Sequence, residues 1–194
     1  MVAPLSSKLC FIKVGTFAEL ALGLLSKAGM KVRAIFLLPV LALLSGCVSP
    51  RYTYQYVPGK TAEKMGRYAV APPAAPPEVH AAIAAANRIA GLPYSYGAGH
   101  GTRVDSAYDC SGAASYVLRG AGKLGAAETS QSFRDYGVPG PGEWITIYAK
   151  KGHVFMSVAG LRYDTGWTDS PKGPQWTMRD RPADGCVLRH PVGL

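Results

Sequence analysis

Apolar residues recur at helical spacing in two segments of the chain. In the first they fall three or four positions apart, at Val79, Ile83, Ala86 and Ala90. This pattern predicts a helix that starts at Glu78 and ends at Gly91, a residue type that is common at helix C-termini. The second segment has its apolar face at Ala113, Ala114, Val117 and Leu118. It predicts a helix that starts near Cys110, with Asp109 as a favourable N-cap, and ends at Gly120.

The spacing of apolar residues changes to two after the turn Gly140-Pro141-Gly142. Four segments of alternating or β-branched residues are then predicted as strands: 144–148, 153–159, 161–165 and 187–190. The single Gly160 between two of these segments predicts a tight hairpin over 153–165. Helices followed by antiparallel strands predict an α+β domain, in which the N-terminal helices pack on an antiparallel β-sheet.

Residues 30–46 have the layout of a secretory signal peptide. Lys31 and Arg33 precede an uninterrupted apolar run over 34–44, which is too short to span a bilayer about 30 Å thick. The ending Leu44-Ser45-Gly46-Cys47 resembles a bacterial lipobox. The resemblance implies cleavage before Cys47, lipidation of its sulfur and a membrane anchor made of acyl chains. The alternative is a buried core helix that happens to end in Cys47.

The residues around this signal add two expectations. Residues 1–29 carry a second apolar stretch ahead of a complete signal, so we expect translation to start at Met30 and 1–29 to be a mis-called upstream extension. Val48 stands where an Asp would retain a lipoprotein of this kind in the inner membrane. In an organism that has an outer membrane, this favours anchoring there, on the periplasmic face.

Residues 47–77 are predicted to be the lipidated Cys and a proline-rich linker. Four prolines between positions 72 and 77 favour an extended polyproline conformation, which would hold a domain away from its anchor. The alternating Tyr52, Tyr54 and Tyr56 leave an edge strand as the alternative. The folded domain is accordingly expected over 78–194.

The composition excludes several classes of protein. With 48% hydrophobic residues, 17% charged residues and 4 Cys in 194 residues, the chain is not an acidic disordered tail, a collagen-like fibre or a disulfide scaffold. The net charge of +9 lies partly in the leader, and the remaining excess is too weak to indicate nucleic acid. Neither Cys-x-x-Cys nor His-Glu-x-x-His occurs, so we expect no metal site and no cofactor.

Cys110 has the surroundings of a nucleophile. A thiol attacks only as its thiolate, which a helix N-terminus and a nearby imidazolium stabilise. Cys110 follows a predicted N-cap, and His153 opens a later strand, where its ring could project at the end of the sheet. The alternatives are a small core residue or a disulfide with Cys186, the other Cys of the domain. Because the catalytic use explains more of the surrounding sequence, we expect no disulfide.

Three segments in order extend this pattern: Gly91-Leu92-Pro93-Tyr94, Tyr108-Asp109-Cys110-Ser111-Gly112-Ala113 and Gly152-His153-Val154. Together they resemble the NlpC-type family of cell-wall cysteine endopeptidases, and the match covers residues 79 to about 166. The resemblance implies a papain-like fold. It departs from the family in a longer loop between Tyr94 and Cys110, and in Gly142-Glu143 where the family has Gly-Asp.

The resemblance also implies residue roles. Cys110 would attack the amide carbonyl, and His153 would protonate the leaving amine. The backbone N–H at Cys110 and the hydroxyl of Tyr94 would stabilise the oxyanion. Asp109 and Ser111 flank the nucleophile where family members touch substrate.

The third catalytic position is less defined by the resemblance. It lies about a dozen residues beyond the histidine in this family, where this chain has Asp164 and Thr165. We expect Asp164 to orient the His153 ring, with Thr165 and His190 as alternatives. A substrate role is open for His100 in the glycine-rich loop, and His80 is expected to be solvated. The tail, with Trp167, Trp176 and Arg179-Asp180-Arg181, could wall the cleft or serve only in packing.

The sequence thus predicts a lipid-anchored, monomeric peptidoglycan endopeptidase with a thiolate mechanism. The family resemblance implies cleavage of the stem-peptide amide between D-glutamate and the diamino acid, so the partners are stem peptides and the membrane at Cys47. One alternative is an amidase or acyltransferase that uses Cys and His on the same fold. The other is a catalytically inactive lipoprotein that binds the cell wall.

Overall fold

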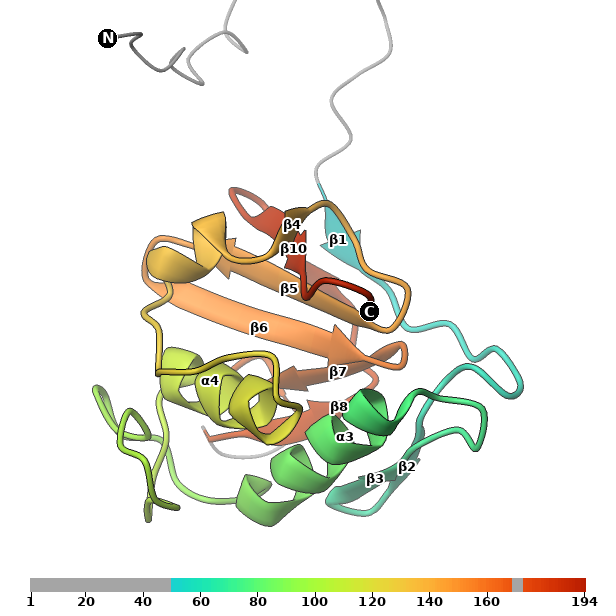
Figure 1. The fold of residues 1–194 in the computed structure, drawn as a ribbon, viewed down its shortest axis with the longest axis horizontal. Coiled ribbons are helices and arrows are strands. Elements are labelled where there is room, and N and C mark those ends of the chain that lie inside the picture. The colour runs from blue at the N-terminus through green and yellow to red at the C-terminus, as the bar shows by residue number, and fades with distance from the viewer. Residues whose placement is uncertain (1–49, 169–172) are drawn as a thin grey trace, which may run out of the picture. The chain divides into compact units, whose positions relative to one another are not determined.

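The computed structural model of the chain describes residues 50–168 and 173–194. The upstream extension, the signal peptide and the lipidation site at Cys47 lie outside the described residues. Within them, two helices and antiparallel strands form an α+β domain, which confirms the predicted fold class (Figure 1). No helix of this described part is long and apolar enough to cross a membrane.

The main sheet is antiparallel throughout and has the strand order β4-β10-β5-β6-β7-β8. Its strands are β4 (Val138–Pro139), β5 (Ile145–Lys150), β6 (His153–Val158), β7 (Leu161–Asp164), β8 (Gln175–Thr177) and β10 (Val187–His190). The predicted hairpin is confirmed, since Val158 pairs with Leu161 around Gly160. His153 pairs with Lys150 and is the first residue of β6, so it lies at one end of the sheet.

The two helices lie side by side on one face of this sheet (Figure 1). They are α3 (Pro77–Ile89) and α4 (Cys110–Gly120), close to the predicted bounds. Pro77 occupies the first turn of α3, where its missing N–H costs nothing. The helices approach so closely that a Cβ on Gly120 would lie 2.4 Å from the Cβ of Ala85. Only glycine fits at that crossing, so the sequence sets how α4 sits on α3.

The core fills the space between the helices and the sheet. Its large aliphatic side chains come from both layers and are almost fully buried: Val79, Ile83, Val117, Leu118, Ile147 and Met156. Burying one such side chain stabilises the fold by about 1.5–3 kcal/mol. This packing fixes the start of α4 against β6, which is where the candidate nucleophile and histidine are found.

The segment predicted as a linker is folded, and that prediction was wrong for the residues described. The described residues from 50 onward belong to the same compact unit as the helices and the sheet, whereas the folded domain was predicted to start at Glu78. Strand β1 (Arg51–Tyr52) pairs with β9 (Arg181–Pro182), and β2 (Glu63–Met65) forms a hairpin with β3 (Tyr68–Val70). The physical reason is burial of an aromatic ring: Tyr52 is 3% exposed and packs edge-on against Tyr148. The alternative of an edge strand is the correct one for Tyr52.

Several short elements carried no pattern that the sequence could reveal. Strands β8 and β9 and a 3-10 helix (Ser132–Asp135) have two to four residues each. Segments this short do not show a recognisable hydrophobic periodicity. Strand β8 matters for the site because it is the edge strand beside β7, and its Gln175 pairs with Asp164.

Candidate active site

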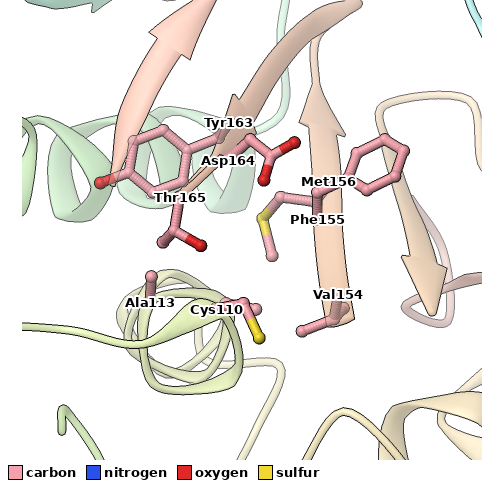
Figure 2. A pocket seen from close by; sticks show the side chains of 9 residues that line it. Cys110, Ala113, Val154, Phe155, Met156, Tyr163, Asp164 and Thr165 are labelled. Carbon is pink, nitrogen blue, oxygen red and sulfur yellow. The ribbon is translucent and has the colours of Figure 1, made fainter. Parts of the chain in front are cut away.

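Cys110 is the first residue of α4, with its thiol free and its side chain largely buried. The predicted N-cap is confirmed, because the Asp109 side chain accepts a hydrogen bond from the N–H of Gly112 at 2.6 Å. Figure 2 shows the sulfur beside Val154, on the side of α4 that faces β6. A thiol in this position experiences the positive end of the helix dipole, which favours the thiolate.

A close approach of the glycine-rich loop holds this end of the helix. A Cβ on Gly112 would lie 2.2 Å from the carbonyl oxygen of Ala98, and a Cβ on Gly99 would lie 2.2 Å from the ring of Tyr108. A side chain at Gly112 would require a backbone shift, and one at Gly99 would displace the buried Tyr108 ring and adopt a positive φ of 84°. Gly112, in a segment that resembles the NlpC-type motif, and Gly99, in the glycine-rich loop, are therefore required by packing around the nucleophile.

His153 connects the thiol to a carboxylate. Its Nε2 lies 3.0 Å from Oδ1 of Asp164, and Cys110 is a side-chain neighbour that raises the pKa of the ring. Burial alone would lower the pKa of His153, but the contacts with Asp164 and Cys110 and the charge of Asp164 outweigh it. The net effect raises the pKa above its usual value of about 6.5. The protonated ring is the form that stabilises a thiolate and later supplies a proton.

Of the three candidates for the third catalytic position, Asp164 is the one that lies next to His153. Its side chain is fully buried, and Oδ1 also accepts a hydrogen bond from the N–H of Gly166 at 3.2 Å. His190 lies elsewhere, on β10, where its Nδ1 is 3.0 Å from the carbonyl oxygen of Gly140. Thr165 lies next to Asp164 but has no contact with the ring among the interactions described; its buried hydroxyl points into a small cavity behind Cys110 (Figure 2).

Tyr94 lies at the mouth of the site. It is 37% exposed, and the structure pairs its backbone with Tyr108, directly before the Asp109-Cys110 turn. Partial burial raises the pKa of Tyr94, and the nearby charges of Cys110 and Asp109 add to this. The hydroxyl is therefore protonated at neutral pH, which is what a hydrogen-bond donor to an oxyanion requires.

Asp109 and Ser111 are placed differently from what a substrate contact would suggest. Both are 6% exposed. The Asp109 carboxylate accepts hydrogen bonds from the backbone N–H groups of Gly97 and Gly112 and from the hydroxyl of Ser111. Its geometry is that of a residue that ties the glycine-rich loop to the start of α4.

His100 is the more accessible member of this cluster. Its Nε2 lies 3.2 Å from Oδ1 of Asp109 and 3.3 Å from Oγ of Ser111, and its side chain is 31% exposed. A substrate that approaches this cluster would reach the imidazole before the carboxylate. His80 is exposed on α3, as expected.

The structure brings two arginines to Asp164: Arg162, which the sequence analysis did not assign to the site, and Arg181, which it named only in a tail that could wall the cleft. Both donate from Nη1 to Oδ2 of Asp164. One signal was available for Arg162, because residues two apart on a strand share a face and Arg162 precedes Asp164 by two. No sequence pattern indicated that Arg181 contacts Asp164, because the two residues lie 17 positions apart on different strands.

The side chains of the site are of the kinds that take part in acid–base and nucleophilic chemistry. Over residues 50–168 and 173–194, no three side chains of His, Cys, Asp or Glu gather as metal ligands would.

In comparisons with known proteins, no protein-family model matches the chain, and neither does any curated protein. The geometry is thus a buried thiol at a helix N-terminus, linked through an imidazole to an ionisable carboxylate.

Proposed function

We propose that this protein is a cysteine hydrolase with a papain-like fold that cleaves amide bonds. The observation that carries the proposal is the position of His153, whose Nε2 lies 3.0 Å from Oδ1 of Asp164 and whose pKa is raised by both Asp164 and Cys110. In the proposed arrangement a protonated ring donates from Nε2 to the carboxylate and from its other nitrogen to the thiolate. Helices packed against an antiparallel sheet, with the nucleophile at a helix start and the histidine at a strand start, support the papain-like assignment.

The reaction follows from these positions. The Cys110 thiolate attacks the amide carbonyl, and the carbonyl oxygen takes the negative charge of a tetrahedral intermediate. The N–H groups of the first turn of α4, which have no partner within the helix, and the Tyr94 hydroxyl would donate to that oxyanion. The His153 imidazolium gives its proton to the leaving amine, and a thioester remains on Cys110. Water, deprotonated by the now neutral ring, then releases the acid and restores the thiol.

The proposed substrate is the stem peptide of peptidoglycan, at the amide between D-glutamate and the diamino acid. The resemblance of the Tyr94, Cys110 and His153 segments to NlpC-type endopeptidases supports this choice. The lipobox-like sequence ending in Cys47 supports a place in the cell envelope, anchored by acyl chains and, where an outer membrane exists, on its periplasmic face. The alternatives are an amidase or acyltransferase on the same fold, which would use the same Cys110 and His153, and an inactive lipoprotein that binds the cell wall without cleaving it.

Digestion of purified muropeptides, followed by mass spectrometry, tests the substrate. We expect new termini at D-glutamate and the diamino acid with the wild type and with Cys186→Ala, and none with Cys110→Ala. Cys186 is a matched control because it is the other free thiol of the domain. Termini at the sugar–peptide bond would indicate an amidase, and a transferred acyl group an acyltransferase. Binding to sacculi without any product from the wild type would overturn the hydrolase.

Alkylation with iodoacetamide tests the thiolate without a substrate. Cys110 should react faster than Cys186 near neutral pH, since burial raises the pKa of the Cys186 thiol. The advantage of Cys110 should disappear in His153→Gln, which retains a polar side chain but carries no charge. Equal, slow alkylation of both thiols in the wild type would contradict the Cys–His pair.

A further inference from the structure

The carboxylate of Asp164 is surrounded by cationic groups. Oδ1 accepts hydrogen bonds from the His153 ring and from the N–H of Gly166, at 3.0 and 3.2 Å. Oδ2 accepts hydrogen bonds from both Arg162 and Arg181. The side chain is 0% exposed, so no water competes for these oxygens. With both oxygens engaged from opposite sides, the carboxylate has a single orientation relative to the histidine ring.

Arg162 is held by several contacts, although its buried Nε has no hydrogen-bond partner among the described residues. Its side chain is 0% exposed, and Nη2 donates to the carbonyl oxygen of Trp167 at 2.6 Å. Its guanidinium carbon lies 5.7 Å from the ring centre of Tyr52, whose hydroxyl accepts a hydrogen bond from the Arg162 backbone N–H at 3.0 Å. Trp167 has a positive φ of 58°, so the bond to its carbonyl also holds a strained turn directly after Asp164.

Arg181 reaches the same carboxylate from a distant part of the chain. It opens β9, and its Nη1 also donates to the carbonyl oxygen of Gly166 at 3.1 Å. The guanidinium carbon lies 4.6 Å from the ring centre of Phe155, a cation–π contact that holds the group in place. The side chain is 11% exposed, so Arg181 can be replaced with less disturbance of packing than Arg162.

We propose that Arg162 and Arg181 are positioning residues of the Cys110–His153 pair, which act by holding the Asp164 carboxylate in one orientation toward the His153 ring. The inference rests on the proposed function. A guanidinium stays charged throughout the working range of pH, so it is a permanent partner for a buried carboxylate. Buried ion pairs seldom stabilise a fold more than apolar side chains of the same volume would. Two arginines on one carboxylate are therefore better explained by the orientation they impose than by stability.

The arginines also adjust the charge that His153 experiences. The groups that face its ring are Asp164 on β7, the thiol of Cys110 on α4 and Arg181 on β9, with Arg162 behind the carboxylate. Burial lowers the pKa of His153, the contacts with Asp164 and Cys110 raise it, and the charge of Arg181 lowers it. Removing the charge of Arg181 should therefore raise the pKa of His153 further, while loosening the carboxylate that orients the ring.

Arg181→Gln in the full chain tests this role. The titration of the His153 ring, followed by NMR with the signal assigned from its loss in His153→Gln, should move to higher pH. For hydrolysis, kcat should fall by up to about 100-fold with KM nearly unchanged, because misorientation affects the chemical step. Arg181→Lys should restore the titration, because it keeps the charge, but only part of kcat. Arg51→Gln is the matched control, since Arg51 is exposed on the paired strand β1.

The outcomes separate this inference from the proposed function. A folded Arg181→Gln protein with the wild-type His153 titration and kcat would overturn the positioning role, even if its melting temperature fell. Should Arg181→Gln fail to fold, a wild-type kcat in Arg181→Lys would overturn the requirement for the guanidinium. If the wild type hydrolyses no muropeptide, the proposed function fails, and the titration of His153 in Arg181→Gln still decides whether Arg181 controls the charge of the ring.

Discussion

At the scale of single residues, His153 links the chemistry of the site to the stability of the fold. Its pKa in the folded protein is higher than in the unfolded chain, where it is about 6.5. A proton therefore binds the folded state more tightly. The resulting stabilisation is fully present below the unfolded pKa and is lost as the pH rises through the folded pKa.

This coupling can be measured with His153→Gln, in which the site no longer titrates. The free energy of unfolding of the wild type relative to the variant should be largest below pH 6.5 and should decline as the pH rises through the folded pKa. Urea denaturation at a series of pH values gives the difference directly. Asp164, Arg162 and Arg181 are present in both proteins, so their effects cancel to first order. A difference that grows with pH would contradict the contacts that raise the pKa.

The local sequence of Asp109-Cys110-Ser111 predicted the start of α4 but not the burial of its polar side chains. Its sequence predicted both the N-cap and the nucleophile, and the N-cap is confirmed by the bond from Gly112 to Asp109. A role in touching substrate, carried over from the family, remains a prediction for Asp109 and Ser111. Their burial shows instead that the accessible polar group here is the ring of His100. Side-chain burial depends on the loop that folds over the helix start, and no local pattern encodes it.

At the scale of elements, α4 is positioned by backbone contacts that a side chain would break. Gly112→Ala would place a Cβ 2.2 Å from the Ala98 carbonyl oxygen, which belongs to backbone and cannot rotate away. We expect a loss of about 1–3 kcal/mol in the free energy of unfolding. A displaced start of α4 should also reduce alkylation of Cys110.

The matched control for this change is Gly125→Ala. A Cβ at Gly125 would meet nothing within 4 Å, and no positive φ is found there. Chemical denaturation of both variants compares them, and the control should stay within about 0.5 kcal/mol of the wild type. Equal stability of Gly112→Ala and Gly125→Ala would show that the loop does not pack on α4 as described.

Which elements were predictable follows from their length. The helix patterns of 79–90 and 113–118 and the alternation of 144–165 are long enough to show a period, and α3, α4 and β5–β7 lie where they were expected. Strands β1 and β9 have two residues each and pair over a separation of about 130 positions. Such pairing depends on tertiary contacts. For the same reason, the approach of Arg181 to Asp164 could not be inferred from sequence.

At the scale of the whole molecule, the N-terminal segment and the active site form one structure. Tyr52 on β1 donates from its hydroxyl to the carbonyl oxygen of Gly160 at 2.8 Å, and the same hydroxyl accepts a bond from the N–H of Arg162. One phenol therefore connects the β6–β7 turn with β7, the strand that carries Asp164. Strand β1, which follows the proposed lipid attachment site in sequence, thus supports the strand of the candidate catalytic carboxylate.

Tyr52→Phe tests this connection, because it removes the hydroxyl and keeps the ring against Tyr148. The buried N–H of Arg162 and the carbonyl of Gly160 would lose their partner, which costs about 1–3 kcal/mol in the free energy of unfolding. Tyr56→Phe is the control, since that hydroxyl is exposed and contacts only Glu63 among the residues described. Urea denaturation of both variants measures the cost.

The same pair of variants shows whether the support extends to catalysis. A looser Arg162 should hold Asp164 less firmly, so Tyr52→Phe should lower kcat under conditions where the protein is fully folded, whereas Tyr56→Phe should not. A kcat equal to that of the wild type, with the expected loss of stability, would show that β1 supports the fold alone. A reduced kcat would show that β1 is part of the structure that orients His153, so that truncating the chain at residue 78 would remove a support of the candidate site as well as the proposed lipid attachment site.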